Sequence, residues 1–532
     1  MPAKSARFSG SPRPPKRAKP RPKRWSNLLG WLLGGTAVAL LLPMGLLYLR
    51  GAFREAVVYD LTNVPAVDDS RFPITVMGLA DAMPTAGVMT GFWVEADAIY
   101  AARNDAIAQA QQSIQYETYY MTPGRRADDF AAALSERSQA GVSVQMLVDA
   151  YGTDDMPDDY WQRLRNAGVE VRFFREFDWK APTDYNSRTH RKLLILDGQQ
   201  VLLGGAGASD QWDGDSEIDD VAPWLDFEVS YEGAIARLLQ GQFWQNWAYE
   251  GGSVDVSDVW MPEALEDAEP FADPFLDLSA QSAAEDTNPN AENAAGDTET
   301  EAVANPENPE FSDSLDTVNN ADADNLANDA VDELDSESVD ASDDSPSNSV
   351  TPLYVTDNTS ALNESTVRLL ALTHIAAANE RLWLGSPYFV PDASTREALM
   401  AARERGVDVR VLTMSEKNDK PLVHYASRVL YGELLAAGVT ICEYQPSMMH
   451  AKMTLVDDGW VSTGSANFDP RSYFHNDELN VSTAHPQLVA SVEQFFADAQ
   501  EQSNCPSYEE WRERSLWERI QGRFALAFKD LM

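Results

Sequence analysis

Apolar and polar positions repeat in the same order along two stretches of the chain, residues 85–251 and residues 351–532. Each stretch predicts a strand, a helix, a strand, a helix, a strand and then a hairpin, because short strand-like apolar runs alternate with longer amphipathic patterns. The run SIQYETYYMTP in the first stretch corresponds to RLWLGSPYFVP in the second, and AGVSVQMLVDA corresponds to RGVDVRVLTMS. Likewise, LRNAGVEVRFF corresponds to LLAAGVTICEY. The repeated order predicts an internal duplication of an α/β unit with a largely parallel sheet.

One polar motif stands in the predicted hairpin of each stretch, as THRKLLILDG and as MHAKMTLVDDG. The two sets are His190, Lys192 and Asp197, and His450, Lys452 and Asp457. A small-residue turn follows each hairpin, with Gly204 and Gly205 in the first copy and Gly464 and Ser465 in the second. Since the chain has only 6 His, chance is a poor explanation for two matches on the same predicted scaffold.

Two copies of a His and Lys pair suit the transfer of a phosphoryl group. We expect the two α/β domains to pack about a pseudo-two-fold axis, which would place His190 and His450 on opposite sides of one phosphorus atom. One imidazole can then attack while the other protonates the leaving alcohol. Lys192 and Lys452 would neutralise the non-bridging oxygens, so the pattern requires neither a metal nor another cofactor. A metal site is the alternative, but a Lys at the second position would repel a cation.

A nucleophilic imidazole also needs a carboxylate that holds its other nitrogen. Glu228, together with Asp226, follows the first motif in WLDFEVSYEG, and Glu478 follows the second in FHNDELNVS. We therefore expect Glu228 and Glu478 to belong to the catalytic group. Asp197 and Asp457 stand beyond the apolar strand of each hairpin, where a structural role at the turn is expected.

The N-terminal part predicts a membrane anchor. Residues 1–26 hold nine Lys or Arg and no acidic residue, and residues 28–49 hold no charged residue. An apolar helix of that length can cross the hydrocarbon core of a bilayer, and the basic residues before it favour a cytosolic N-terminus. We expect a basic cytosolic tail over 1–27, one transmembrane helix over 28–49, and the rest of the chain on the far side of the membrane.

The net charge of −43 is unevenly distributed and narrows the possible partners. Residues 252–350 hold 28 acidic residues and no Lys or Arg. Such a segment buries too little apolar surface to fold, so an acidic disordered insert is expected there. The remaining chain is acidic as well, which argues against a nucleic-acid partner. A salt-rich environment would suit this surface, and an ordinary acidic protein is the alternative.

Two shorter features leave alternatives open. Cys442 and Cys505 are too few for a disulfide framework, so two buried free thiols are expected, with a pairing outside the cytosol as the alternative. The C-terminal sequence WERIQGRFALAFKDLM places apolar residues near helical spacing. Its apolar face is expected to pack against the domain, and contact with a membrane surface is the alternative.

The duplicated motif resembles the signature of the phospholipase D superfamily, HxKxxxxD followed by GGxN or GSxN, here as HRKLLILDGQQVLLGGAG and HAKMTLVDDGWVSTGSAN. Within that superfamily the chain looks most like bacterial cardiolipin synthases, on the segments SPYFVP, RGVDVRVL and HNDELN. The resemblance implies two phospholipase D-like α/β domains, a phospholipid substrate, and a place in the bacterial inner membrane with the catalytic part on the outer, periplasmic face.

The resemblance also implies a reaction and a set of roles. A phosphatidyl group would pass from one phosphatidylglycerol to His190, and then to a glycerol hydroxyl of a second phosphatidylglycerol. His450 would serve as the acid and base of both steps, and the pseudo-symmetry of the two copies equally allows the reverse assignment. The residues that would bind the phosphate are Asn467, Ser465 and Gly205. The products would be cardiolipin and free glycerol.

One residue departs from the family pattern. Gly207 stands where the motif after the first hairpin has Asn. Either Ser209 substitutes for the missing amide or the first half-site is weaker, and an inactive paralogue is a further alternative. A phospholipase D that hydrolyses phospholipids to phosphatidic acid would use the same His and Lys residues, as would a nuclease of the superfamily. The predicted anchor and the acidic surface argue against the nuclease.

Overall fold

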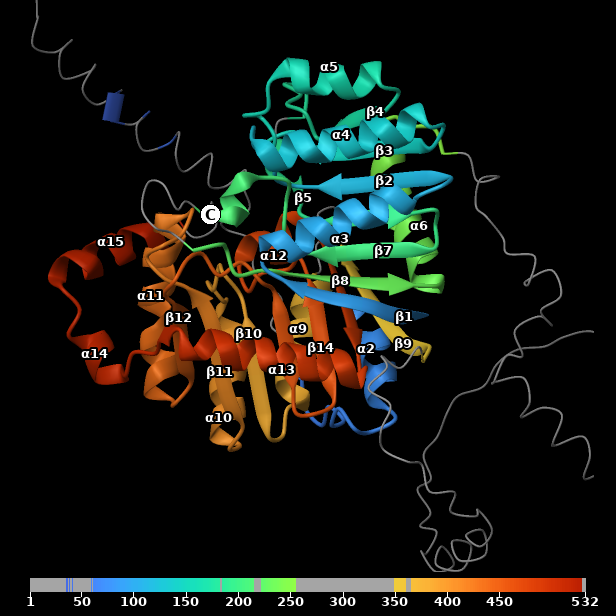
Figure 1. Cartoon of the computed structure of the whole chain (residues 1–532). Helices are drawn as coiled ribbons and strands as arrows, with labels where there is room; N and C mark the ends of the chain where they lie inside the picture. The colour runs from blue at the N-terminus through green and yellow to red at the C-terminus, as the bar shows by residue number, and fades with distance from the viewer. Residues whose placement is uncertain are drawn as a thin grey trace, which may run out of the picture. The chain divides into compact units, whose positions relative to one another are not determined.

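The computed structural model (Figure 1) describes residues 35, 36, 38, 41, 59, 61–181, 184–214, 222–254, 349–359 and 365–528. The expected basic tail over 1–27, and nearly all of the expected anchor over 28–49 and of the expected acidic insert over 252–350, lie outside these residues. Within the described part of the chain, no helix combines the length and the apolar character that crossing a membrane requires.

Both halves of the chain contribute to one sheet of 16 strands. The strands of the first half are β1 (Met83–Val94), β2 (Ser113–Thr118), β3 (Ser143–Asp149), β4 (Glu170–Phe174), β5 (Arg188–Thr189), β6 (Leu193–Leu196), β7 (Gln200–Gly204) and β8 (Phe227–Glu232). The strands of the second half are β9 (Thr351–Asn358), β10 (Arg381–Gly385), β11 (Asp408–Met414), β12 (Thr440–Tyr444), β13 (Met453–Val456), β14 (Trp460–Gly464), β15 (Asn476–Thr483) and β16 (Ser503–Asn504).

The strand order is the same in the two halves when each is read outward from the centre of the sheet. At the centre, β1 pairs antiparallel with β9, from Met83 opposite Val355 to Gly87 opposite Thr351. The order continues as β8-β7-β6-β2-β3-β4 from β1 and as β15-β14-β13-β10-β11-β12 from β9. The outer strands β2, β3 and β4 are parallel, as are β10, β11 and β12. The mixed α/β prediction is confirmed, but the expected largely parallel sheet is wrong, because the motif hairpins and the central strands pair antiparallel.

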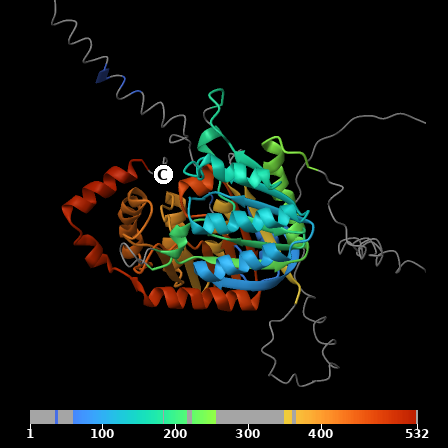
Figure 2. The same cartoon turned by 45° about the horizontal axis from the view of Figure 1, so that its top comes forward.

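Helices pack on both faces of the sheet (Figures 1 and 2). They are α2 (Phe72–Ala80), α3 (Ala96–Gln109), α4 (Arg125–Gln139), α5 (Asp158–Asn166), α6 (Ala234–Tyr249), α9 (Thr366–Ala377), α10 (Ala393–Glu404), α11 (Pro421–Ala436), α12 (Pro470–Phe474), α13 (Pro486–Glu501), α14 (Tyr508–Arg512) and α15 (Leu516–Leu526). Two short 3-10 turns are η1 (Asp184–Asn186) and η2 (Asp210–Asp213).

One apolar core spans the two halves. It contains Phe243 and Trp247 from α6 of the first half, together with Val492 and Phe496 from α13 of the second half. Burial of each such side chain contributes about 1.5–3 kcal/mol. This shared core, together with the β1–β9 pairing, joins the halves into one folded body.

Helix α2 lies before the predicted start of the first domain, yet it packs with the second half. Phe72, Val76 and Ala80 join an apolar core that also contains residues of α9. The ring of Phe72 meets the edge of Trp460 at a centroid distance of 5.0 Å. The predicted boundary at residue 85 missed this helix because its sequence, FPITVMGLA, is short and almost uniformly apolar.

The last residue of each motif fastens its hairpin to a neighbouring strand. The Asp197 carboxylate accepts hydrogen bonds from three successive backbone N–H groups, 111 to 113, at 2.7 to 2.9 Å. Asp457 accepts from the equivalent groups of Asn379, Glu380 and Arg381, at 2.8 to 3.2 Å. Both aspartates have positive φ, 53° and 49°, which suits a tight hairpin turn. This geometry supports the structural role expected of both residues.

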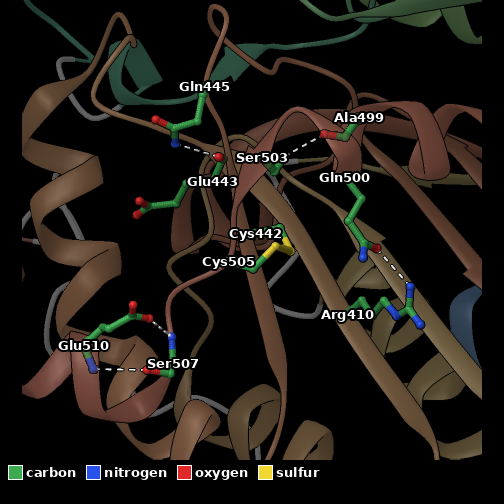
Figure 3. The surroundings of a disulfide bond; sticks show 10 residues. All are labelled: Arg410, Cys442, Glu443, Gln445, Ala499, Gln500, Ser503, Cys505, Ser507 and Glu510. Atoms are coloured by element: carbon green, nitrogen blue, oxygen red, sulfur yellow. Dashed lines mark hydrogen bonds between the residues drawn. A yellow bond between two sulfur atoms is a disulfide. The ribbon is translucent and has the colours of Figure 1, made fainter.

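The two cysteines form a disulfide, so the expectation of two free thiols is wrong. Cys442 in β12 is bonded to Cys505, 63 residues further along the chain (Figure 3). The strand β16, directly before Cys505, pairs antiparallel with β12 through Glu443 opposite Asn504 and Tyr444 opposite Ser503. Pairing and disulfide together fix the C-terminal segment to the edge of the sheet.

The C-terminal segment forms the expected helix, but its apolar face does not pack as expected. α15 lies along α11, and a side chain at Gly522 would collide with Val429 and with the backbone of Tyr425. Gly522 and Ala525 are buried in this contact, whereas Trp517 and Phe524 are exposed. Helix contact is therefore made by small residues, and the large apolar residues face outward.

Candidate active site

The two motif histidines are each held by backbone of the opposite half. His190 follows β5, which pairs in parallel with β15, and its N–H donates to the carbonyl of Asp477 at 2.9 Å. The N–H of His450 donates to the carbonyl of Leu225 at 2.7 Å. Both imidazoles are therefore positioned at the junction between the halves.

The side chains repeat this exchange between halves. Nδ1 of His190 lies 3.0 Å from Oε2 of Glu478, and Nδ1 of His450 lies 2.8 Å from Oδ2 of Asp226. The backbone carbonyl of Ser465 is a further acceptor 3.0 Å from Nδ1 of His190. A proton on Nδ1 can thus be donated to a carboxylate in both cases, which leaves Nε2 as the reactive nitrogen.

Asp226 makes the contact that was expected of Glu228, and the expectation for Glu228 is corrected accordingly. Glu228 is fully buried and receives two hydrogen bonds of 2.6 Å from Arg103 of α3. Arg103 in turn donates to the carbonyls of Gly207 at 2.9 Å and Ala206 at 2.8 Å. Glu228 therefore acts on the loop after the first hairpin, through Arg103, and does not orient an imidazole.

The strand register explains the difference. Glu228 lies opposite Gly204, and the equivalent Gly464 lies opposite Asn480. Counted from these glycines, the position of Glu478 corresponds to that of Asp226, two residues before Glu228. Residues two apart on a strand share a face, so both acids satisfied the sequence pattern. The loops before them differ in length, which hid the correct correspondence.

Burial keeps both imidazoles neutral. It lowers the pKa of His190 to about 4 and that of His450 to about 3, although Glu478 and Asp226 oppose the shift. Burial alone would raise the pKa of Asp226 and Glu478, but the adjoining histidines and the motif lysines hold both below their ordinary values. Near neutral pH the site therefore holds ionised carboxylates and neutral imidazoles.

The motif lysines point at their own histidines. Nζ of Lys192 donates to the carbonyl of His190 at 2.8 Å, and Nζ of Lys452 lies 2.9 Å from Nε2 of His450. Burial, followed by the charge of Lys452, lowers the pKa of Lys192 to about 7. Burial lowers the pKa of Lys452 to about 8 against the attraction of Asp226 and Glu478. The charges of the two copies thus act on one another, which is expected of one joint site.

The residues expected to bind phosphate are divided between the two pairs: Ser465 lies at the His190–Glu478 pair and Gly205 at the His450–Asp226 pair. Ser465 donates to Glu478 at 2.5 Å, and Ser472 donates to the other oxygen of that carboxylate at 2.7 Å. The Asn467 side chain is buried, and within the described part of the chain its Oδ1 has no hydrogen-bond partner. At Gly205 a Cβ would lie 2.1 Å from Oδ1 of Asp226. Glycine there leaves room for Asp226 to reach His450.

Gly207 is explained by close approach of the backbone. A Cβ at this position would lie 2.2 Å from the carbonyl oxygen of Tyr120, so an Asn cannot enter without moving the segment that follows β2. The Ser209 hydroxyl contacts Thr122 at 2.5 Å and accepts from the N–H of Gln211 at 3.2 Å. Ser209 is thus engaged within the protein, and the expectation that it replaces the missing amide is not supported.

Aromatic side chains lie against the two imidazoles, and no sequence pattern indicated their role. The His450 ring lies edge-on to Trp212 at 5.3 Å and near Trp224 at 5.7 Å. Trp212 also donates to Asp226 at 2.9 Å. Tyr119 lies 5.3 Å from the His190 ring. These rings exclude water from the carboxylate and imidazole pairs and strengthen their interaction.

A family model and curated relatives that match the chain carry the same description. A family model described as "Cardiolipin synthase, PLD-like domain" matches the chain over residues 104–219 and 371–499. Cardiolipin synthase 2 of Bacillus anthracis is 28% identical over 425 residues, which are 80% of this chain and 67% of that protein. Cardiolipin synthase A of Pseudomonas fluorescens is 27% identical over 440 residues, 82% of this chain and 74% of that protein.

A solved structure shares the fold. A phosphatidylserine synthase of Haemophilus influenzae gives a TM-score of 0.54 at 12% sequence identity, with 86% of this chain and 97% of that chain covered. Each of the two segments matched by the family model contains one His and Lys pair.

Proposed function

Because the chain belongs to the phospholipase D superfamily, we propose that it is a membrane-anchored phosphatidyltransferase of the cardiolipin synthase type. It joins two phosphatidylglycerol molecules into cardiolipin and releases glycerol. The observation that carries the proposal is the pair of imidazoles whose Nδ1 atoms face the carboxylates of Glu478 and Asp226, each from the opposite half. Two such imidazoles supply the nucleophile and the acid that a two-step transfer needs.

In the first step, Nε2 of His190 attacks the phosphorus of a phosphatidylglycerol. The phosphorus–oxygen bond to the headgroup glycerol breaks, and the departing glycerol oxygen takes a proton from Nε2 of His450, to which the Lys452 ammonium supplies that proton. In the second step, His450 takes a proton from a hydroxyl of another phosphatidylglycerol, whose oxygen displaces His190 from phosphorus. Lys192 and Lys452 offset the negative charge that the phosphoryl oxygens gather in both transition states.

The contacts of the two imidazoles favour this division of roles. Lys452 lies 2.9 Å from Nε2 of His450 and supplies a nearby source of protons. Within the described residues His190 makes its side-chain hydrogen bonds through Nδ1, so the lone pair of Nε2 is available for attack. Asn467, Ser465 and Gly205 line the phosphate, and the buried Asn467 amide, whose oxygen has no hydrogen-bond partner among the described residues, is available to contact it.

The architecture belongs to the same proposal. The two halves are copies of one phospholipase D-like domain, related by a pseudo-two-fold axis through the β1–β9 junction. Residues 28–49 anchor the chain, and the catalytic part lies on the outer face of the inner membrane. The disulfide between Cys442 and Cys505 supports this location, because structural disulfides form and persist in oxidising compartments.

The test is a product analysis with the full-length protein in detergent micelles. Labelled phosphatidylglycerol is incubated with a chelator, at low and at high salt, and the lipid products are separated. Cardiolipin with an equal amount of glycerol is expected, and the His190→Ala and His450→Ala variants should form neither. Phosphatidic acid as the sole lipid product would replace the proposal with a hydrolytic phospholipase D. Absence of any product at every salt concentration would remove phosphatidylglycerol as the substrate.

A further inference from the structure

The outward face of α15 carries a continuous apolar stripe. The exposed fractions of its side chains are 74% for Leu516, 66% for Trp517, 50% for Ile520 and 62% for Phe524. At 100° per residue, these four positions fall within an arc of about 100° on one side of the helix. We call them the α15 stripe. Aromatic and aliphatic side chains of this size are normally buried, so a continuous exposed set indicates a contact surface.

The charges beside the stripe have one sign. Arg519 and Arg523 are exposed on the same helix and flank one side of the stripe. The only acid of α15, Glu518, is turned away from it: its carboxylate accepts from the N–H of Ser515 at 2.9 Å and lies 3.5 Å from Arg428 of α11. In a chain with a net charge of −43, the two arginines beside the stripe make this part of the surface complementary to an anionic partner.

The helix on which α15 packs, α11, begins near the active site. α15 runs along α11 so that its later residues approach the start of that helix, where Leu422 is also exposed, at 55% (Figure 1). Asp419, two residues before this start, accepts hydrogen bonds of 2.9 Å from the Tyr388 hydroxyl. Its charge also acts on the Lys452 ammonium of the active site.

We infer that the α15 stripe lies in the interface of an anionic phospholipid bilayer. Its apolar side chains enter the boundary between headgroups and acyl chains, while Arg519 and Arg523 contact lipid phosphates. This is the binding mode of interfacial amphipathic helices, whose apolar face sits about 5–10 Å deep. A second copy of the chain is a poorer occupant, because a stable protein interface needs about 20–30 residues a side and the stripe offers four large residues.

The inference goes beyond the proposed reaction, since it concerns where the protein meets the membrane and not what it catalyses. It adds a contact in the folded domain to the anchor expected over residues 28–49. With the domain held by this second point, the active-site end of α11 faces the lipid surface and not the solvent.

Fluorescence quenching by lipids tests the inference on the full-length protein. Both native cysteines are disulfide-bonded, so a cysteine introduced as Ile520→Cys is the single site for a thiol-reactive fluorophore. The matched control is Gln162→Cys on the polar surface of α5. Each labelled protein is reconstituted into phosphatidylcholine vesicles with about a third phosphatidylglycerol, with acyl chains either brominated or not.

The expected result is bromine quenching at least about threefold stronger at position 520 than at position 162. The substitutions Trp517→Ser and Phe524→Ser, added to the Ile520→Cys chain, should reduce it to the control level. Equal quenching at 520 and 162 would overturn the inference. So would a label that becomes buried in lipid-free detergent as protein concentration rises, which would assign the stripe to a second copy.

The outcome is separable from that of the proposed function. The readout is the position of the label and requires no turnover. A protein that forms no cardiolipin but shows strong quenching at 520 would remove the proposed reaction and leave the membrane contact in place.

Discussion

The Nδ1 atom of His450 lies 2.8 Å from Oδ2 of Asp226, although the two residues come from opposite halves of the chain. Trp212 donates a second hydrogen bond to the same oxygen, at 2.9 Å. The carboxylate is thereby fixed on two sides, and it fixes the imidazole in turn. His190 and Glu478 form the corresponding pair in the other half-site.

Asp226→Asn and Glu478→Gln should each lower kcat by about 10²- to 10⁴-fold, because a neutral amide neither sets the imidazole tautomer nor stabilises its protonated form. The measurement is the initial rate of lipid product formation per folded molecule. Glu228→Gln, two residues further along the chain, is the matched comparison. It should lower the melting temperature and leave kcat largely unchanged. Wild-type turnover in Asp226→Asn, together with loss of turnover in Glu228→Gln, would return the orienting role to Glu228.

Activity should fall on both sides of a window between about pH 4 and about pH 7. Burial lowers the pKa of His190 to about 4, so below this value the imidazole binds a proton and loses its nucleophilic lone pair. The pKa of Lys192 is lowered to about 7 and that of Lys452 to about 8. Above these values the ammoniums lose the charge that offsets the phosphoryl oxygens.

The pH dependence of kcat/KM checks this window. A Lys192→Arg variant should keep its charge at every pH examined, because the guanidinium does not deprotonate in proteins. Whatever its absolute rate, its alkaline limb should move toward higher pH. An unchanged alkaline limb would mean that Lys192 does not set it.

Asp457→Ala should lower the free energy of unfolding by about 2 kcal/mol, because three backbone N–H groups lose a charged acceptor and Ala is strained at positive φ. Asp458→Ala is the matched control. That neighbouring carboxylate is 80% exposed and pairs with Arg381 at the surface, which is worth about 0–1 kcal/mol. Urea denaturation of both variants measures the difference. Equal stability losses would refute the structural role of the motif aspartate.

Removing the disulfide should cost about 4 kcal/mol, since it closes a loop between residues 63 positions apart. The double variant Cys442→Ala, Cys505→Ala should therefore unfold at a lower urea concentration than the wild type. Wild-type protein treated with a reductant should unfold at the same urea concentration as the double variant. Thiol titration of the unreduced, denatured protein should find no reactive thiol. Two reactive thiols per chain would contradict the pairing.

Features that depend on short stretches of sequence could be predicted. The motif hairpins, their aspartate turns and the alternation of strands and helices follow from local patterns, and they are present as β6–β7 and β13–β14. The His and Lys pairs were found because the same three positions recur in the same context. The local sequence was sufficient to predict each of these features.

Features that depend on pairing between distant segments could not be predicted. No pattern in the sequence indicates that β1 meets β9, or that β5 adds to β15. Without that register, Asp226 and Glu228 are equivalent candidates on one strand face, and neither half reveals that it supplies the carboxylate for the other. The disulfide was missed for the same reason, because the contact of β16 with β12 is a tertiary one.

The exchange of carboxylates between the halves makes activity conditional on assembly. During synthesis, the first half emerges with His190 but without Glu478, and its imidazole has no partner to set its tautomer until the second half has folded against it. A chain truncated or cleaved between the halves is therefore inactive unless the pieces reassociate. Only the completely folded chain can therefore carry out the proposed reaction, and a half-made protein cannot.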